Sequence, residues 1–453
     1  MIPCRALVLI AMSTNCRDQR AWFMGLLADS ARRPDRAAVG RNAPEQKASI
    51  SRMAVVMTGA TGFLGLHLLQ RHLTAGRRVI VLAHVNSPPA WERIEYFLAN
   101  AGTENVPPAL VRKLVDVVEV DIAEDRMGLS REQHQRLALS AEELWHVAAS
   151  VTLHRDDAAV WRTNVVGTEQ LLRLASSTAP HVPVRHVSTA FVAGRTPHLV
   201  TEDDSLHVIE FENTYEKSKH TAEGLVRDWT RLTGRSTLVL RPSILVPGAQ
   251  WASGLPTHTL ETLHHSVAVV TARTKRSTPR LVVRFAGDPR AWINLLQVDW
   301  AAEAMMRLAT LPHQSGTHTF HVTHPNDVPV LTIAAAFEEL SPVRIRITPA
   351  QPAEPTLPER VLYRRVAGFL PYLHHRRSFS GTRLAQALPQ LAPPAPIDRG
   401  YLERALGVRA ANQSPARGLG GAVRMTPRSA TDNNSGHGNG SPVIPNCSAT
   451  SRY

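Results

Sequence analysis

The sequence predicts an α/β fold in which a doubly wound parallel sheet is followed by a smaller C-terminal portion. Two observations carry this prediction. From Met53 onward, short apolar runs alternate with segments of helical periodicity, and this alternation is typical of parallel βαβ units. The first apolar run, Ala54 to Met57, leads directly into the glycine-rich segment Thr58 to Gly65. A buried strand, a glycine turn and a helix in this order indicate a nucleotide-binding unit.

The glycine turn has the spacing Gly-x-x-Gly-x-x-Gly, and each glycine has its own expected task. Gly59 allows the tight turn, Gly62 lets the backbone approach a pyrophosphate, and Gly65 lets the helix pack closely on the strand. The amide groups at the start of the helix then face the phosphates. The other residues of this expected cofactor turn are Thr61, Phe63 and Leu64. Together they predict a Rossmann-type fold.

Further strands are expected at the apolar runs that follow. They are Arg78–Ala83, Val115–Val120, Glu143–His146, Val184–Ser188 and Ser236–Leu240. After Arg241-Pro242 the pattern is irregular and contains four recognisable pieces. These are a strand-like Arg280–Phe285, a helical Val298–Leu311, a strand-like Thr319–Val322 and a helical Tyr401–Leu406.

The chain is therefore expected to have four parts. Residues 1–52 form a poorly ordered extension, 53–242 the NAD(P)-binding domain, and 243–409 a substrate-binding portion packed on it. Residues 410–453 are rich in Gly, Ser, Asn and Pro, and we expect a disordered tail there. Met53 stands directly before the first strand, so it is a hypothetical alternative start of the functional protein.

Composition argues against several function classes. The net charge is +13, but residues 1–50 hold eight basic and four acidic side chains, and residues 410–453 hold four arginines and one aspartate. Because more than half of the excess charge lies at the two ends, nucleic-acid binding is disfavoured. No apolar run approaches the roughly 18–20 residues of a transmembrane helix. The three cysteines lie near the termini, which disfavours a disulfide framework or cysteine metal site and fits a cytoplasmic protein.

A tyrosine and a lysine are placed for proton transfer. Tyr215 and Lys219 stand four residues apart, so they share one face if a helix begins there. A cation beside a phenol lowers its pKa from about 10, which would let the tyrosine exchange a proton near neutral pH. A solvated helix start is the alternative interpretation of the same pair.

Polar and small residues follow two of the predicted strands. Ser188-Thr189 comes after Val184–Val187, at the carboxyl end where open α/β sheets bind ligands, and a hydroxyl there can hydrogen-bond a carbonyl oxygen. His146 is followed by the small residues Ala148 and Ala149, which would let a cofactor lie close to the backbone. His146 itself is expected to be structural. Asn164 is a polar residue inside an apolar helical pattern, for which capping or a buried amide is the simplest role.

The order of these motifs resembles the extended short-chain dehydrogenase/reductase superfamily. Within it, the chain is most similar to acyl-thioester reductases: the terminal reductase domains of peptide and polyketide synthetases, carboxylic acid reductases, and fatty acyl-CoA reductases of the male sterility type. The resemblance covers about residues 53–325. The segments that carry it are Gly62-Phe63-Leu64-Gly65, Trp91-Glu92-Arg93-Ile94, Gly128-Leu129-Ser130, His146 to Val151, Val187 to Val192, Asn213-Thr214-Tyr215, Ala222-Glu223, Arg241-Pro242-Ser243 and Val298-Asp299-Trp300.

The resemblance implies roles for individual residues. Thr189, Tyr215 and Lys219 would form a catalytic triad, and Asn164 would be a fourth member that holds a water relay. Lys219 would also bind the nicotinamide ribose. The residues that would contact the cofactor are Gly59, Thr61, Gly62, Phe63, Leu64, Gly65, Arg93, Asp121, Ile122, Ala148, Ala149, Tyr215 and Lys219. No metal site is expected.

Two departures from the family pattern bear on the cofactor. The second strand ends in Leu82-Ala83-His84 rather than Leu-Val-Arg, so one ribose-phosphate contact is missing while Arg93 remains. The same strand end lacks the acidic residue that would bind the free ribose hydroxyls of NAD, which favours NADP, with NAD as the alternative. Val120 replaces a glycine before Asp121.

The resemblance implies NAD(P)H-dependent reduction of an acyl thioester, carried on coenzyme A or on a carrier protein, to an aldehyde or alcohol. Two alternatives remain open at this point. One is an extended reductase or epimerase acting on a sugar nucleotide, steroid or other ketone, and the region after Pro242 would decide it. The other is an NADP-sensing binding protein without turnover, against which the intact Thr189, Tyr215 and Lys219 argue.

Overall fold

The computed structural model describes residues 53–85, 89–100, 106–153, 158–196, 198–204, 210–248, 256, 258–272 and 280–412. The predicted extension 1–52 lies outside these residues, and so does the predicted tail 410–453 apart from residues 410–412, which end a helix. Met53, the hypothetical alternative start, is the first described residue. Among the described residues, no helix combines the length and the apolar character that a membrane span requires.

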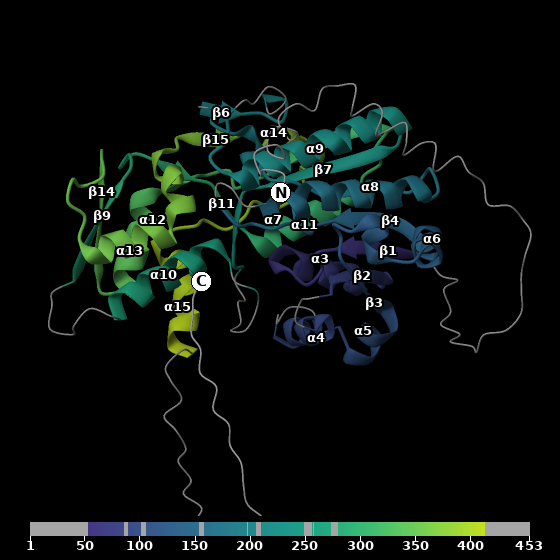
Figure 1. Cartoon of the computed structure of the whole chain (residues 1–453), viewed down its shortest axis with the longest axis horizontal. Helices are drawn as coiled ribbons and strands as arrows, with labels where there is room; N and C mark the ends of the chain where they lie inside the picture. The colour runs from purple at the N-terminus through teal and green to yellow at the C-terminus, as the bar shows by residue number, and fades with distance from the viewer. Residues whose placement is uncertain are drawn as a thin grey trace, which may run out of the picture. The chain divides into compact units, whose positions relative to one another are not determined.

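The main sheet has seven strands and is fully parallel (Figure 1). Its order is β12-β7-β5-β4-β1-β2-β3. The strands are β1 (Ala54–Thr58), β2 (Val79–His84), β3 (Val115–Val120), β4 (Ala141–His146), β5 (Val184–Val187), β7 (Ser236–Pro242) and β12 (Gly316–Val322). This confirms the predicted fold class, and each predicted strand is present with its bounds shifted by at most a few residues.

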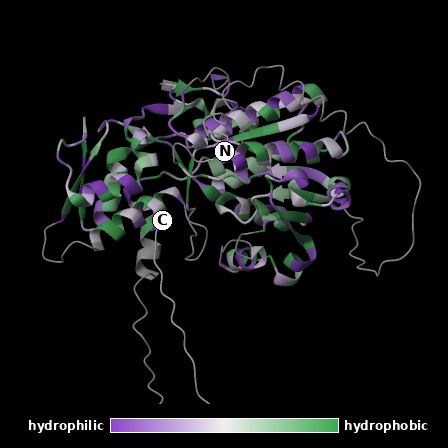
Figure 2. Ribbon diagram, viewed as in Figure 1, coloured by the Kyte–Doolittle hydropathy of each residue, from purple (hydrophilic) through white to green (hydrophobic). Residues whose placement is uncertain are grey.

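Helices cover both faces of this sheet, so its inner strands are almost wholly buried, whereas the edge strands β3 and β12 are partly exposed. All five residues of β1 are buried, and Figure 2 shows β7 as mostly hydrophobic. Continuous apolar runs are expected when both faces of a parallel sheet are covered. On one face lie α3 (Phe63–Thr74), α4 (Ala90–Asn100), α5 (Pro108–Leu114) and α11 (Val298–Thr310). On the other lie α6 (Arg131–Ser140), α7 (Ala158–Trp161), α8 (Gly167–Ser177) and α9 (Thr214–Thr233).

The chain reverses its winding between β1 and β4. Strands β1, β2 and β3 run outward in one direction, and β4, β5 and β7 run outward in the other. Ligands of open α/β sheets bind at such a switch point, beyond the carboxyl ends of the strands. The glycine turn follows β1, and the Ala148–Ala149 loop follows β4, so both flank this switch point.

The C-terminal portion consists of short sheets and helices with cores of their own. Its paired strands are β8 (Ile244–Val246) with β11 (Leu295–Gln297), β9 (Leu281–Ala286) with β14 (Val343–Thr348), and β10 (Trp292–Ile293) with β13 (Val328–Pro329). Its helices are α10 (Thr259–Ala272), α12 (Val330–Leu340), α13 (Leu357–Arg365), α14 (Thr382–Ala387) and α15 (Arg399–Asn412).

The expected domain boundary at residue 242 does not match the path of the chain. α11 and β12 lie beyond that boundary, yet α11 packs on α3 and β12 is the edge strand of the central sheet beside β7. Conversely, β6 (His198–Val200) leaves the first part and pairs with β15 (Arg377–Phe379). The two portions therefore exchange segments, which a linear reading of periodicity does not reveal.

Candidate active site

The glycine turn has the geometry that its spacing predicts. Gly59 has φ of +69°, and a Cβ atom there would lie 2.4 Å from the backbone nitrogen of Ala148. A Cβ at Gly65 would lie 1.9 Å from the Gly59 carbonyl oxygen, so α3 packs directly on the turn. Only glycine fits at these two places, because the left-handed backbone and the close approach both exclude a side chain.

The start of α3 is suited to hold a diphosphate. Gly62 is the N-cap residue with the extended backbone usual at that position; being glycine, it has no capping side chain, and no acidic residue stands in the first turn. The first amides of a helix have no partner within the helix, and together with the helix dipole they favour an anion. A Cβ at Gly62 would be 3.3 Å from the Gly59 carbonyl. The turn therefore fits the pyrophosphate of a dinucleotide.

The side chains of Phe63 and Leu64, the two residues after Gly62, pack against other parts of the protein. The Phe63 ring stacks on His258 at the start of the C-terminal portion, with ring centres 5.8 Å apart. Leu64 is buried in the core below α3. Their part in cofactor binding, which remains a prediction, would come from their backbone amides. Thr61 is partly buried in the turn.

The expected adenine site lies after β3. The Asp121 carboxylate accepts a hydrogen bond from the Ala123 amide at 3.0 Å and forms an ion pair with Arg162 at 3.2 Å. Ile122 is buried against Gly167, where an added Cβ would lie 2.9 Å from the Ile122 Cδ1. A small residue at 167 thus lets α8 approach the loop after β3. That Asp121 and Ile122 border the adenine stays a prediction.

Two residues bear on recognition of the adenosine ribose. β2 ends in the exposed His84, so no carboxylate stands at that strand end. Arg93 on α4 is partly buried, and its guanidinium makes no hydrogen bond or ion pair with any other described residue. A cation on the helix that follows a strand end without an acid is compatible with a 2′-phosphate.

His146 belongs to a hydrogen-bonded chain that joins the loops of the site. Val147 and Ala148 donate to the Thr58 Oγ1 at 3.2 Å, and Thr58 donates to the His146 Nδ1 at 2.9 Å. The His146 Nε2 then donates to Thr168 at 2.9 Å. Burial lowers the pKa of His146 to about 3, with a contribution from Lys219. The ring is therefore neutral and has a structural role, as expected.

Asn164 lies in a π-helical turn (Arg162–Val166) and is almost completely buried. Its Oδ1 accepts from the Ser150 amide at 2.8 Å, and its Nδ2 donates to the Ser150 carbonyl at 3.0 Å and to the Ser218 hydroxyl at 2.9 Å. All amide hydrogens of the side chain are thus in use. These contacts tie the loop after β4 to α9, so they support a positioning role; the predicted water relay has no free side-chain donor to use.

Thr189 and Tyr215 meet beyond the carboxyl ends of β5 and β7. Thr189 is buried at the N-cap of a short 3-10 helix, η3 (Ala190–Ala193), and its hydroxyl lies 3.4 Å from the Pro242 carbonyl. The Tyr215 hydroxyl is hydrogen-bonded to the Thr189 side chain. Tyr215 is the second residue of α9, where Asn213 provides the N-cap. The structure therefore brings together two hydroxyls that are 26 residues apart in the sequence.

Lys219 does not act on Tyr215 in the way the spacing suggested. Its Nζ donates to the Val187 carbonyl at 2.7 Å, and burial lowers its pKa to about 8 against the opposing charge of Glu223. Burial raises the pKa of Tyr215 to about 12, although the hydrogen bond with Thr189 favours a lower pKa. The expected lowering of the tyrosine pKa is thus not what this structure shows, because desolvation of the phenol dominates.

A buried ion pair between Glu223 and Arg241 holds the end of β5 next to the candidate site. Its function was not recognised in the sequence. Glu223 accepts from Arg241 at 2.5 and 3.0 Å, from Arg227 at 2.8 Å and from the Ser188 hydroxyl at 2.8 Å. Although burial opposes ionisation, the Arg241 guanidinium lowers the pKa of Glu223 to about 2. Ser188 precedes Thr189, so this pair fixes the end of β5.

Comparison with known proteins agrees with this arrangement. A model of the family described as "Male sterility protein", an NAD-binding domain, matches residues 57–305. The chain belongs to this family. It is accordingly an NAD(P)-dependent oxidoreductase of the extended short-chain dehydrogenase/reductase type that uses a nicotinamide cofactor.

The curated relatives that the chain matches are much longer proteins. The chain is 30% identical over 292 residues to a carboxylic acid reductase of Mycobacterium marinum (strain ATCC BAA-535 / M), which covers 60% of this chain and 24% of that protein. It is 29% identical over 291 residues to an isonitrile lipopeptide synthase of Mycobacterium tuberculosis (strain ATCC 25618 / H37Rv), covering 60% of this chain and 12% of that protein. The chain thus spans a quarter or less of these two relatives.

Solved structures show the same fold. The terminal R domain of the myxalamid PKS-NRPS pathway has a TM-score of 0.62 at 20% identity, covering 86% of this chain and 97% of that one. The reductase domain of a nonribosomal peptide synthetase from Mycobacterium tuberculosis has a TM-score of 0.61 at 22% identity, covering 85% and 95%. A UDP-galactose 4-epimerase scores 0.52 at 17% identity, covering 80% and 100%.

Proposed function

We propose that this chain is an NADPH-dependent reductase of acyl thioesters carried on coenzyme A or on a carrier protein. The observation that carries the proposal is the pair of hydroxyls, Thr189 and Tyr215, which are hydrogen-bonded to each other, with Lys219 one turn further along α9. Carboxylic acid reductases and synthetase reductase domains are among the proteins to which the chain is similar, which supports a thioester as substrate.

In the proposed reaction, Thr189 and Tyr215 bind the carbonyl oxygen of the thioester. Negative charge develops on this oxygen as the carbonyl carbon is reduced, and two hydroxyl donors in a protein interior stabilise that charge more than water would. Tyr215 then transfers its phenolic proton to the oxygen. The raised pKa of Tyr215, about 12, keeps the phenol protonated at neutral pH, which is the state that a proton donor requires.

Lys219 would serve both the cofactor and the tyrosine. Its Nζ donates one hydrogen bond to the Val187 carbonyl, and an ammonium group has three donors, so two remain for a ribose hydroxyl and a water molecule or phenol. When bound, the nicotinamide supplies a hydride to the carbonyl carbon. At neutral pH the lysine is charged, because its pKa is about 8.

The products follow from counting the hydride and the proton that are added to the thioester. Addition of one hydride and one proton to the thioester gives a hemithioacetal, and cleavage of its carbon–sulfur bond releases a thiol and an aldehyde. A second hydride and proton convert the aldehyde to an alcohol. Tyr215 must regain its proton from solvent after each round.

Within this proposal, NADPH is favoured over NADH. β2 carries no acid at its end, where NAD-binding folds place a carboxylate for the ribose hydroxyls, and Arg93 stands on the helix that follows. A 2′-phosphate would meet a cation rather than a carboxylate there. Carrier proteins and phosphopantetheine are acidic, which would suit the net charge of +6 on residues 51–409.

A cofactor-oxidation screen tests the proposal. Purified protein is mixed with NADPH or NADH and with acyl-CoAs, acyl-loaded carrier protein, aldehydes, steroid ketones or sugar nucleotides, and absorbance at the nicotinamide band is followed. Turnover of acyl thioesters with NADPH supports the proposal. Turnover confined to sugar nucleotides or ketones would favour the epimerase-like alternative, and tight NADPH binding without any turnover would favour a sensor.

A further inference from the structure

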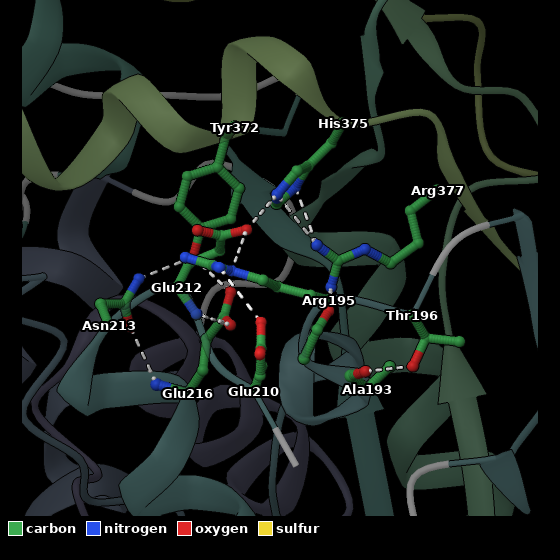
Figure 3. Close-up of polar contacts among 11 residues, drawn as sticks. Ala193, Arg195, Thr196, Glu210, Glu212, Asn213, Glu216, Tyr372, His375 and Arg377 are labelled. Atoms are coloured by element: carbon green, nitrogen blue, oxygen red, sulfur yellow. Dashed lines mark hydrogen bonds and ion pairs between the residues drawn. The ribbon is translucent and has the colours of Figure 1, made fainter. Parts of the chain in front are cut away.

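A second buried polar network lies beside the proposed site and joins two distant segments of the chain (Figure 3). We call it the bridging network. One segment, residues 193–216, connects η3 with the start of α9; the other, residues 372–377, belongs to the C-terminal portion. The members of the network are Arg195, Glu210, Glu212, Asn213, Glu216, Tyr372, His375 and Arg377.

Tyr372 holds the first turn of α9. Its hydroxyl donates to the Glu216 Oε1 at 2.7 Å and accepts from the Asn213 Nδ2 at 3.0 Å. Asn213 in turn caps α9 through the Glu216 amide at 2.9 Å, and the second Glu216 oxygen accepts from the Glu212 amide at 3.0 Å. Tyr215 lies between these two anchored residues. One hydroxyl of the C-terminal portion therefore fixes the backbone that carries the proposed proton donor.

Arg377 holds the other proposed catalytic element. Its guanidinium donates to the carbonyl of Gly194, which is the C-cap of the short helix that begins at Thr189, and it lies over the Phe191 ring with 5.7 Å to the ring centre. It also donates to His375 at 2.9 Å, and the His375 Nε2 lies 3.0 Å from the Glu212 carboxylate. Burial lowers the pKa of His375, which favours the neutral ring.

The part of the network around Tyr372 and Arg377 is buried, whereas Arg195 and Glu210 at its edge are exposed. Glu216 is fully buried, Arg377 is 4% exposed and Tyr372 is 6% exposed. A buried donor or acceptor that loses its partner keeps its full desolvation cost, because water cannot replace the bond. The segment 372–377 therefore has little freedom to move relative to α9 and η3 once the network has formed.

We propose that Tyr372 and Arg377 are positioning residues that set Tyr215 against Thr189. They touch neither the reacting atoms nor the cofactor cradle; they act through Glu216 and Asn213 on one side and through Gly194 on the other. The predicted effect on kcat rests on the proposed function. The predicted effect on the position and burial of Tyr215 rests on the geometry alone.

The kinetic test compares Tyr372→Phe with Tyr363→Phe. Tyr363 on α13 also donates its hydroxyl to a carbonyl of the C-terminal portion, that of Arg284, but it has no contact with α9, so it is a matched control. A misplacement of about 1 Å can cost on the order of 100-fold in rate. We expect Tyr372→Phe to lower kcat about 10- to 100-fold with little change in the KM for NADPH, and Tyr363→Phe to keep kcat within about twofold. Equal kcat values for the two variants would overturn the inference.

A second measurement needs no substrate. The titration of Tyr215 is obtained as the tyrosinate absorbance of each protein minus that of the same protein carrying Tyr215→Phe, recorded by stopped-flow pH jumps before unfolding. The pKa of Tyr215 is raised to about 12 chiefly by burial. Release of the α9 start in Tyr372→Phe exposes the phenol, so we expect the midpoint to fall toward the ordinary value of about 10, whereas Tyr363→Phe leaves it unchanged.

The two measurements separate the inference from the proposed function. A wild-type protein without thioester turnover, but with a midpoint that falls in Tyr372→Phe, refutes the proposed function and supports the positioning role. An unchanged Tyr215 midpoint in Tyr372→Phe refutes the positioning role, whatever substrate the enzyme accepts. Thermal unfolding is measured for both variants: similar midpoints would show that the difference in kcat comes from the position of Tyr215, whereas a much lower midpoint for Tyr372→Phe alone would count against the positioning role.

Discussion

Substitution of Gly65 by alanine is the most direct perturbation of the cofactor turn. The added Cβ would lie 1.9 Å from the Gly59 carbonyl oxygen, 2.8 Å from the Gly59 carbonyl carbon and 2.9 Å from the Ala60 carbonyl carbon. All three neighbours are backbone atoms, so no side chain can rotate away. Since real Cβ contacts stay at 3.0 Å or more, α3 and the turn must separate by about 1 Å.

This separation has two expected consequences. Overpacking of this kind costs about 1–3 kcal/mol of folding free energy. The amides at the start of α3 also move away from the bound pyrophosphate, and each 1.4 kcal/mol of lost binding raises Kd tenfold. We expect Gly65→Ala to raise the Kd for NADPH about 10- to 100-fold.

The assay is a fluorescence titration with NADPH, combined with urea unfolding. Gly224→Ala is the matched control, because Gly224 lies inside α9 and an added Cβ meets nothing within 4 Å. Alanine in a helix interior is about 0.5–1 kcal/mol more favourable than glycine, so this control should unfold at higher urea and bind NADPH normally. Wild-type affinity and stability in Gly65→Ala would refute the assigned role of the close helix–turn contact.

Three further predictions concern the side chains of the site. Tyr215→Phe should lower kcat at least 100-fold while NADPH affinity, measured by the same titration, changes little; full activity would exclude Tyr215 as the proton donor. Glu223→Gln should destabilise the fold by about 3–5 kcal/mol in urea, because Arg241 remains buried without its carboxylate. In the wild type the pKa of Glu223 is lowered from 4.5 to about 2, so its contribution is complete above about pH 4.5 and is lost as the pH falls toward 2, a loss that the glutamine variant should not show. The pKa of Lys219 is lowered to about 8, so kcat/KM should decline above that pH as the ammonium loses its proton. In Lys219→Arg, kcat/KM should be lower at every pH but should not decline above about pH 8. The same decline in the wild type and in Lys219→Arg would show that another group titrates.

The sequence contained enough to predict the sheet and most of the candidate site. The strand that precedes Gly59 and the helix that follows it have local signatures, and the positive φ of Gly59 and the close contact at Gly65 are what a glycine turn of this spacing requires. Thr189 and Tyr215 could be assigned to one site only because the order of the motifs resembles that of a known reductase family; their local patterns alone left other interpretations open.

Other features depend on contacts between remote segments, and local patterns do not encode them. The direction of the Lys219 ammonium toward the Val187 carbonyl, and the raised pKa of Tyr215, follow from how deeply these groups are buried. β12 pairs with β7 although more than 70 residues separate the two strands in the sequence. The pairing of β12 with the central sheet could therefore not be predicted, and the domain boundary was placed at residue 242. Tyr372 reaches Glu216 across 156 residues, and nothing in its local sequence indicates that partner.

The most direct test of the proposed function is the stoichiometry of thiol release. An acyl-CoA is incubated with the protein and NADPH, and free coenzyme A thiol and oxidised cofactor are measured in the same sample. We predict one thiol released for each NADPH oxidised if the aldehyde is the product, or for every two if the alcohol is, with both signals abolished in Tyr215→Phe. Oxidation of NADPH without release of thiol, or undiminished release in Tyr215→Phe, would contradict the account.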